Sequence, residues 1–145
     1  MTHVNLGKEH PTAYEHVRAL SREADEAAAR AGLDPRLSEL VKIRVSQING
    51  CSFCLRMHTR DALAKGETID RLSVVAAWWE SQYFSEQEQA ALALAEDVTR
   101  LPVPDRRGWD NGSLTDEQVS AISWLAVVMN SWNRIAIRSH YPVGP

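Results

Sequence analysis

The sequence has no long apolar run, no block of basic residues and only two cysteines. Its longest apolar stretch, around Trp124–Met129, is far shorter than the roughly 20 residues that a membrane-spanning helix needs. Lysine and arginine number 16 against 19 acidic residues, for a formal net charge of −3. No basic cluster of the kind that follows a phosphate backbone is present. We therefore expect neither membrane insertion nor nucleic-acid binding.

The first ten residues lack the apolar region and cleavage site of a secretory signal, so we expect a cytoplasmic protein. Structural disulfides are rare in that compartment, where a close pair of cysteines is more typical of redox or metal chemistry. No glycine-rich nucleotide loop follows a strand pattern, so neither flavin, nicotinamide nor haem is implied. We expect no cofactor.

The length of 145 residues, with 44% apolar and 24% charged residues, suits one globular domain over residues 1–145. Apolar residues recur at helical spacing almost throughout, and no strand-period run of useful length is present. We expect about six helices, over residues 12–31, 35–48, 51–65, 68–79, 86–98 and 116–139. The last is apolar on most faces and is predicted to be central.

Start and stop signals support these bounds. Ser85–Glu88 and Thr115–Gln118 match the capping box that opens a helix. Asn49-Gly50 is suited to end one, because both residues tolerate the left-handed conformation. The two prolines within Leu101–Pro104 must interrupt the chain.

Cys51, Cys54 and His58 have a spacing that brings them together on one helix. At about 100° per residue, the three side chains fall within an arc of roughly 60°. Cysteines at i and i+3 in a helix also have Cα atoms within the range of about 4.4–6.8 Å that a disulfide requires. The pair can therefore cycle between dithiol and disulfide without unfolding the helix.

Acidity of the thiols is the second argument. Only the thiolate is nucleophilic, and the first turn of a helix favours an anion. Helix position alone favours Cys51 as the more acidic thiol. Cys54 instead lies one turn before His58, which can take its proton, and this proximity favours Cys54.

Glu39 is the third candidate partner. If Asn49-Gly50 is the tip of a helical hairpin, Glu39 lies opposite about Arg60, within two residues of His58. That offset is about 3 Å along the helix axis, within reach of a glutamate. A proton relay from Glu39 through His58 to Cys54 is then possible. Glu39 is off the apolar stripe of its own helix, so the relay requires that helix to be covered on two sides.

The order and spacing of four residues closely resemble the signature of the alkyl hydroperoxidase D family: Glu39, eleven residues, Cys51, two residues, Cys54, three residues and His58. This family belongs to the wider carboxymuconolactone decarboxylase-like group. The resemblance continues in Asn49-Gly50-Cys51 and in Asn130-Ser131-Trp132-Asn133-Arg134, and it covers about residues 34–137.

The resemblance implies an all-α, single-domain helical bundle with the cysteine pair at a helix N-terminus. It also implies a homo-oligomer, a trimer or hexamer, and a peroxidase that reduces small organic hydroperoxides. Cys54 would become sulfenic acid, Cys51 would close the disulfide, and Glu39 and His58 would relay the proton. A dithiol reductant of the lipoyl or thioredoxin type would then restore the thiols.

One residue departs from the family pattern, because Phe53 stands where the best-known members have a second histidine between the cysteines. This departure argues against an efficient peroxidase with the same reductant, while leaving the redox pair intact. Members that lack the cysteines act as decarboxylases, and the presence of Cys51 and Cys54 argues against that activity here.

Two alternatives use the same thiols without turnover. A redox sensor would oxidise once and change its affinity for a partner. A zinc site could use the cysteines and His58, but a structural site needs a fourth ligand. The remaining histidines have no motif-like spacing to the cluster: His3, His10, His16 and His140.

Two further features carry predictions. Adjacent residues on a helix point about 100° apart, so one of Trp78 and Trp79 should leave its own core and could form an oligomer contact. Asn133 and Arg134 interrupt an apolar helix, and we expect them to hold helices together through hydrogen bonds or ion pairs.

Overall fold

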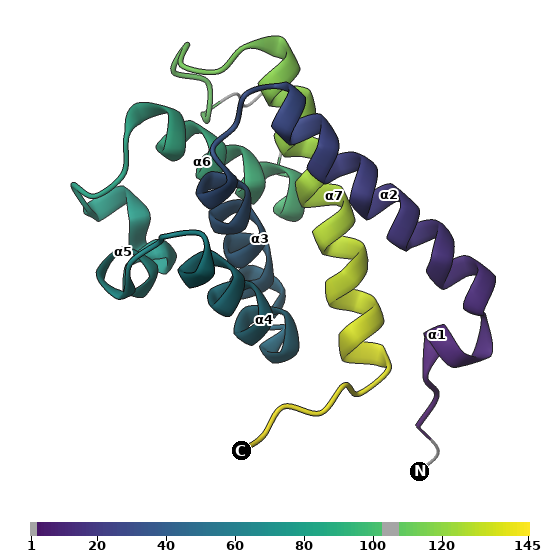
Figure 1. The fold of residues 1–145 in the computed structure, drawn as a ribbon. Coiled ribbons are helices and arrows are strands. Elements are labelled where there is room, and N and C mark those ends of the chain that lie inside the picture. Colours follow the sequence, from purple (N-terminus) through teal and green to yellow (C-terminus); the bar gives the residue numbers. More distant parts are fainter. Residues whose placement is uncertain (1–2, 103–107) are drawn as a thin grey trace.

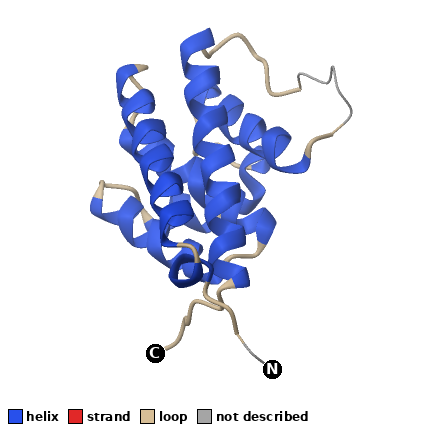
Figure 2. Cartoon of the chain, turned by 90° about the vertical axis from the view of Figure 1, so that its right-hand side faces the viewer, coloured by secondary structure: helices blue, strands red, loops and turns tan. Residues whose placement is uncertain are grey.

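The structure is a computed structural model that describes residues 3–102 and 108–145, and these residues form a helical bundle (Figure 1). Its elements are α1 (Leu6–Glu9), α2 (Pro11–Arg30), α3 (Pro35–Asn49), α4 (Ser52–Ala64), α5 (Ile69–Ser73), the 3₁₀ helix η1 (Val75–Glu80), α6 (Glu86–Arg100) and α7 (Asp116–Arg138). The two described ranges contain no strand, and the all-α prediction is confirmed (Figure 2). Within them, no helix combines the length and the apolar character needed to cross a bilayer.

The helix ends follow the local signals in the sequence. Ser85 and Thr115 both form the predicted capping boxes, at the starts of α6 and α7. Asp34 accepts a hydrogen bond from the Arg36 backbone N–H at the start of α3. α6 ends at Arg100, before the first of the two prolines; Val103 and Pro104 lie outside the described residues. Local side-chain partners for the unpaired N–H groups therefore fix most of the boundaries.

α3 is the most enclosed helix of the bundle. It packs against α4, α6 and α7, and every side chain from Leu37 to Ser46 is buried. Burial on all sides explains how Glu39 can be interior although it is off the apolar stripe. The requirement that this helix be covered on two sides is met.

The prediction of one continuous helix over residues 68–79 is wrong. The chain breaks at Val74 and forms two elements, α5 and η1. Val75 is fully buried, and the Trp78 indole N–H donates a hydrogen bond to Glu96 of α6 at 2.9 Å. These contacts with another helix favour the bend over a straight continuation. Trp79 is 61% exposed while Trp78 is half-buried, so one of the pair does leave the core, as predicted.

α7 packs against α2, α3 and α6, which confirms its central position. It is nevertheless not enclosed like α3, because Trp124, Val127 and Ile137 remain exposed. The N- and C-terminal segments emerge at the same end of the bundle (Figure 2). They are joined there by a hydrogen bond from the Leu6 backbone N–H to the Ser139 hydroxyl at 3.0 Å. The short helix α1, which contains Leu6, was not predicted from the sequence.

Candidate active site

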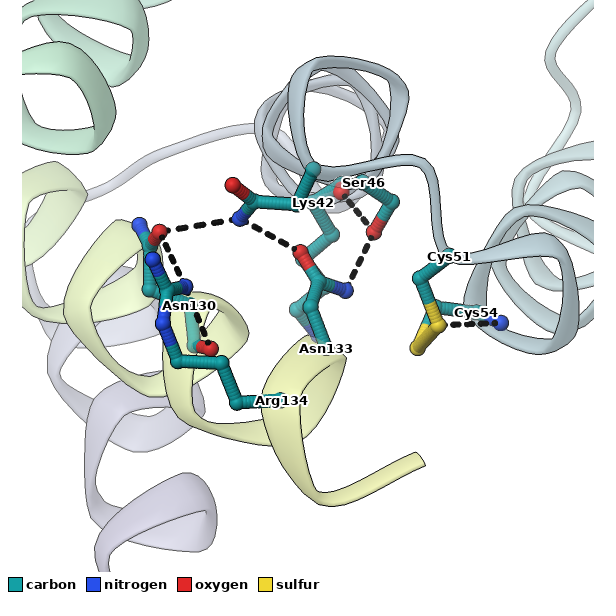
Figure 3. Close-up of a disulfide and its surroundings, with 8 residues drawn as sticks. Lys42, Ser46, Cys51, Cys54, Asn130, Asn133 and Arg134 are labelled. Carbon is teal, nitrogen blue, oxygen red and sulfur yellow. Dashed lines mark hydrogen bonds between the residues drawn. A yellow bond between two sulfur atoms is a disulfide. The ribbon is translucent and has the colours of Figure 1, made fainter. Parts of the chain in front are cut away.

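The turn between α3 and α4 positions the cysteine pair. Gly50 ends α3 in the left-handed conformation at φ +70°, and the backbone N–H groups of Gly50 and Cys51 both donate to the Ser46 carbonyl. Cys51 is the N-cap of α4, and its Sγ accepts a hydrogen bond from the Cys54 N–H at 3.3 Å. The two cysteines are joined by a disulfide, with Cα atoms 5.4 Å apart (Figure 3). The predicted placement at a helix N-terminus is confirmed.

The two sulfurs differ in their access to a pocket. Cys51 and Cys54 are 1% and 2% exposed, so neither lies on the open surface. Cys54 contributes to the wall of a pocket of about 530 Å³ between α2, α3, α4 and α7, whereas Cys51 does not line it. A small molecule that enters this pocket therefore meets Cys54 first.

His58 and Glu39 lie where the hairpin argument placed them. The His58 Nδ1 is 2.9 Å from the Glu39 Oε2, and both side chains are buried. His58 follows Cys54 by one turn of α4, and both line the pocket. Because Glu39 engages Nδ1, the Nε2 atom is the ring nitrogen left for the pocket.

Two lysines that sequence reasoning missed hold the Glu39 carboxylate. Its Oε1 accepts a hydrogen bond from the Lys65 Nζ at 2.5 Å and lies 3.5 Å from the Lys42 Nζ. Burial alone would raise the pKa of Glu39, but the hydrogen bond with His58 and the two ammonium groups outweigh it and lower that pKa to about 2. Glu39 is therefore a carboxylate at neutral pH.

The spacing contained a signal for both lysines. Lys42 follows Glu39 by three residues on α3. Lys65, the C-cap of α4, follows His58 by seven residues, so each lysine shares a helix face with one member of the Glu39–His58 pair. Lys42 is also anchored from α2, by Asp25 at 2.7 Å. That contact depends on long-range packing and has no local signal.

Glu39, His58 and Asp61 have ligand atoms within 4.8 Å of one another, as a metal site requires. Lys42 and Lys65 already neutralise the Glu39 carboxylate, which disfavours a further cation there. Neither cysteine belongs to a metal-holding group within the described ranges, and their sulfurs are bonded to each other. This arrangement gives no support to the zinc alternative.

A polar network ties α7 to the end of α3, beside the cysteines (Figure 3). Asn133 is fully buried; its Nδ2 donates to the Ser46 hydroxyl at 3.0 Å and its Oδ1 accepts from Asn49 at 3.0 Å. The predicted role of Asn133 in holding helices together is confirmed. Arg134 differs from that prediction, because its hydrogen bonds go to Asn130 on its own helix.

The model of the carboxymuconolactone decarboxylase family matches residues 14–97, more than half of the chain. The chain belongs to this family. The matched segment includes all four of Glu39, Cys51, Cys54 and His58.

Two relatives are uncharacterised proteins. The uncharacterised protein YdfG of Bacillus subtilis is 39% identical over 124 residues, covering 79% of this chain and 81% of its own. The uncharacterised protein YnjA of Escherichia coli is 34% identical over 73 residues, covering 50% of this chain and 40% of its own.

A crystal structure from Agrobacterium tumefaciens has a TM-score of 0.85 and 33% identity, covering 99% of this chain and 100% of the other. That protein is of unknown function and is described as a candidate antioxidant defence protein, AhpD. Together with the family match, it confirms the resemblance to the alkyl hydroperoxidase D group within the carboxymuconolactone decarboxylase family.

Proposed function

We propose that this protein is a thiol peroxidase that reduces organic hydroperoxides through Cys54 and Cys51. One observation carries the proposal. Cys54 lines a pocket one helical turn before His58, which is held by a buried carboxylate, and its disulfide partner Cys51 is not part of the pocket lining. The family membership and the antioxidant description of the Agrobacterium protein fit this function.

In the reduced protein, the Nε2 of His58 accepts the proton of the Cys54 thiol, and the thiolate attacks the terminal peroxide oxygen. The O–O bond breaks, Cys54 becomes sulfenic acid, and the alkoxide leaves as the alcohol after taking the proton back from His58. The Cys51 thiol then attacks the sulfenic sulfur. Water leaves with the Cys51 proton, and the disulfide forms. An external dithiol reduces it by exchange and is itself oxidised to a disulfide.

Glu39 supports this cycle by fixing the imidazole. A carboxylate that accepts from Nδ1–H selects the tautomer whose Nε2 can take a proton, and it stabilises the imidazolium that then forms. Lys42 and Lys65 keep Glu39 ionised throughout. A hydroperoxidase of this kind works in a compartment with a reducing dithiol pool, consistent with a cytoplasmic protein.

Assembly into a trimer or hexamer is part of the same proposal. Exposed aromatic and apolar side chains gather along the α5–η1 segment and the chain that follows it: Ile69, Trp79 and Tyr83. Such residues suit a contact between copies. Light scattering of the purified protein would give the mass, and a monomer at working concentration would contradict this part.

The test is steady-state consumption of cumene hydroperoxide with lipoyl, thioredoxin-type and small-thiol reductants in parallel. We expect catalytic turnover with at least one dithiol, loss of turnover in Cys54→Ser and in Cys51→Ser, and normal rates in Ser52→Ala, an exposed control between the cysteines. One oxidation per chain without turnover for any reductant would contradict the proposal and would instead indicate a redox sensor.

A further inference from the structure

The pocket beside Cys54 is apolar and aromatic at one end. Two pairs of rings pack edge to face there, Tyr14 with Trp132 at 5.2 Å between centroids and Phe53 with Tyr141 at 5.0 Å. The Tyr14 hydroxyl lies near Tyr141, and burial together with this hydroxyl raises the pKa of Tyr141. The two pairs are therefore neighbours. Aliphatic side chains of α7 continue this wall: Leu125, Val128 and Met129. The surroundings of Cys54 therefore favour a hydrocarbon.

The other end of the pocket is charged, and its cationic side chains outnumber its acidic ones. It is lined by Arg18, Arg22, Lys42 and Lys65 against Asp25, Glu39 and Asp61. Both lysines are engaged by acidic partners within the pocket, at 2.5–3.5 Å.

The two arginines of α2 are less engaged than these lysines. Arg18 has one exposed pair, with Glu15 at 3.7 Å, and such pairs contribute little. Arg22 makes no ion pair or side-chain hydrogen bond among the residues that the structure describes. These two guanidinium groups are the ones available to an anionic ligand.

The spacing along the helices separates the two ends. Tyr14, Arg18 and Arg22 are four residues apart on one face of α2, so Arg22 lies about 12 Å along the axis from the aromatic end. The backbone of Asp61, on α4, lies about 10 Å along the axis beyond Cys54, although its carboxylate reaches back to within 3.6 Å of the His58 Nδ1. A pocket of about 530 Å³ is within the range that encloses a small ligand.

We propose that the pocket selects an amphipathic hydroperoxide, with the peroxide on a hydrocarbon chain beside Cys54 and a carboxylate head held by Arg18 and Arg22. A fatty-acid hydroperoxide has this chemistry. The inference rests on the proposed peroxidase function for its reaction, and on the charge pattern of the pocket for its specificity. Arg18 and Arg22 are then specificity-determining residues, and they take no part in the bond-breaking step.

The test compares the hydroperoxide of linoleic acid with that of its methyl ester, which differs only in the head-group charge. We expect a higher kcat/KM for the acid, through a lower KM. Each of Arg18→Ala and Arg22→Ala should reduce the acid-to-ester ratio about two- to fivefold. Arg22→Lys should retain most of the preference because it retains the charge. Arg30→Ala, on α2 but outside the pocket, should leave the ratio unchanged.

Equal kcat/KM for acid and ester, or a ratio that the arginine variants leave unchanged, would overturn the inference while leaving the peroxidase function intact. A binding measurement separates the two proposals further. The unreactive hydroxy acid and its methyl ester are titrated into the oxidised protein by calorimetry. If no peroxide is turned over but the acid binds more tightly than the ester, and Arg22→Ala removes the difference, the peroxidase function fails and the carboxylate site stands. Equal binding of the two would count against the site itself.

Discussion

Replacing Glu39 with glutamine removes one negative charge from the interior while nearly preserving the size of the side chain. Glu39 is 1% exposed and contacts His58, Lys65 and Lys42. Burial raises its pKa, but its partners lower it from 4.5 to about 2, which corresponds to about 3 kcal/mol of folding free energy at neutral pH. Because the folded-state pKa is the lower one, this stabilisation is complete above about pH 4.5 and is lost as the pH falls towards 2.

Urea unfolding followed by circular dichroism, with the disulfide kept oxidised, measures this contribution. At neutral pH, the free energy of unfolding of Glu39→Gln should be about 3 kcal/mol lower than that of the unmodified chain. Between about pH 5 and about pH 2 the unmodified chain should lose that advantage, and the two free energies should converge. Asp61→Asn is the matched control: Asp61 is 50% exposed and 3.6 Å from the same imidazole, so its removal should cost below about 1 kcal/mol. If the free energies of unfolding of Glu39→Gln and the unmodified chain changed in parallel over this pH range, the reasoning would be refuted.

Three further substitutions test the helical scaffold, each by denaturant unfolding at neutral pH. Asn133→Ala should cost about 1–3 kcal/mol, because the buried Ser46 hydroxyl and the half-buried Asn49 amide lose a hydrogen-bond partner; an unchanged midpoint would contradict the network. Gly50→Ala should cost about 1–2 kcal/mol from its φ of +70° alone, since nothing lies within 4 Å of the added methyl group. Ser85→Ala should cost about 1 kcal/mol through loss of the α6 cap, and a neutral effect would show that the cap is dispensable.

The parts of the site that the sequence predicts are those set by local rules. Cys51, Cys54 and His58 share one helix, so helical spacing alone brings them together. Glu39 follows from the symmetry of a hairpin whose tip is a left-handed glycine. Capping boxes can also be predicted from the sequence, because the unpaired N–H groups of a helix must find acceptors within a few residues.

The parts that the sequence does not predict depend on which helices meet. The wall from α2, including Tyr14 and Arg22, joins the site only because α2 packs along α7. The break at Val74 is likewise decided by the burial of Val75 and by the bond from Trp78 to α6. Helical periodicity assigns Tyr14 and Arg22 to a helix correctly, but it contains no information on their partners.

The central claim is that Cys54 attacks the peroxide and Cys51 then closes the disulfide. The most direct measurement is mass spectrometry of the reduced Cys51→Ser variant after one equivalent of cumene hydroperoxide, with a sulfenic-acid trap present. We predict a single added oxygen, trapped at Cys54, and in the unmodified chain a Cys51–Cys54 disulfide with one equivalent of alcohol released. Cys54 recovered as an unmodified thiol, while Cys54→Ser takes up the oxygen at Cys51, would contradict the account.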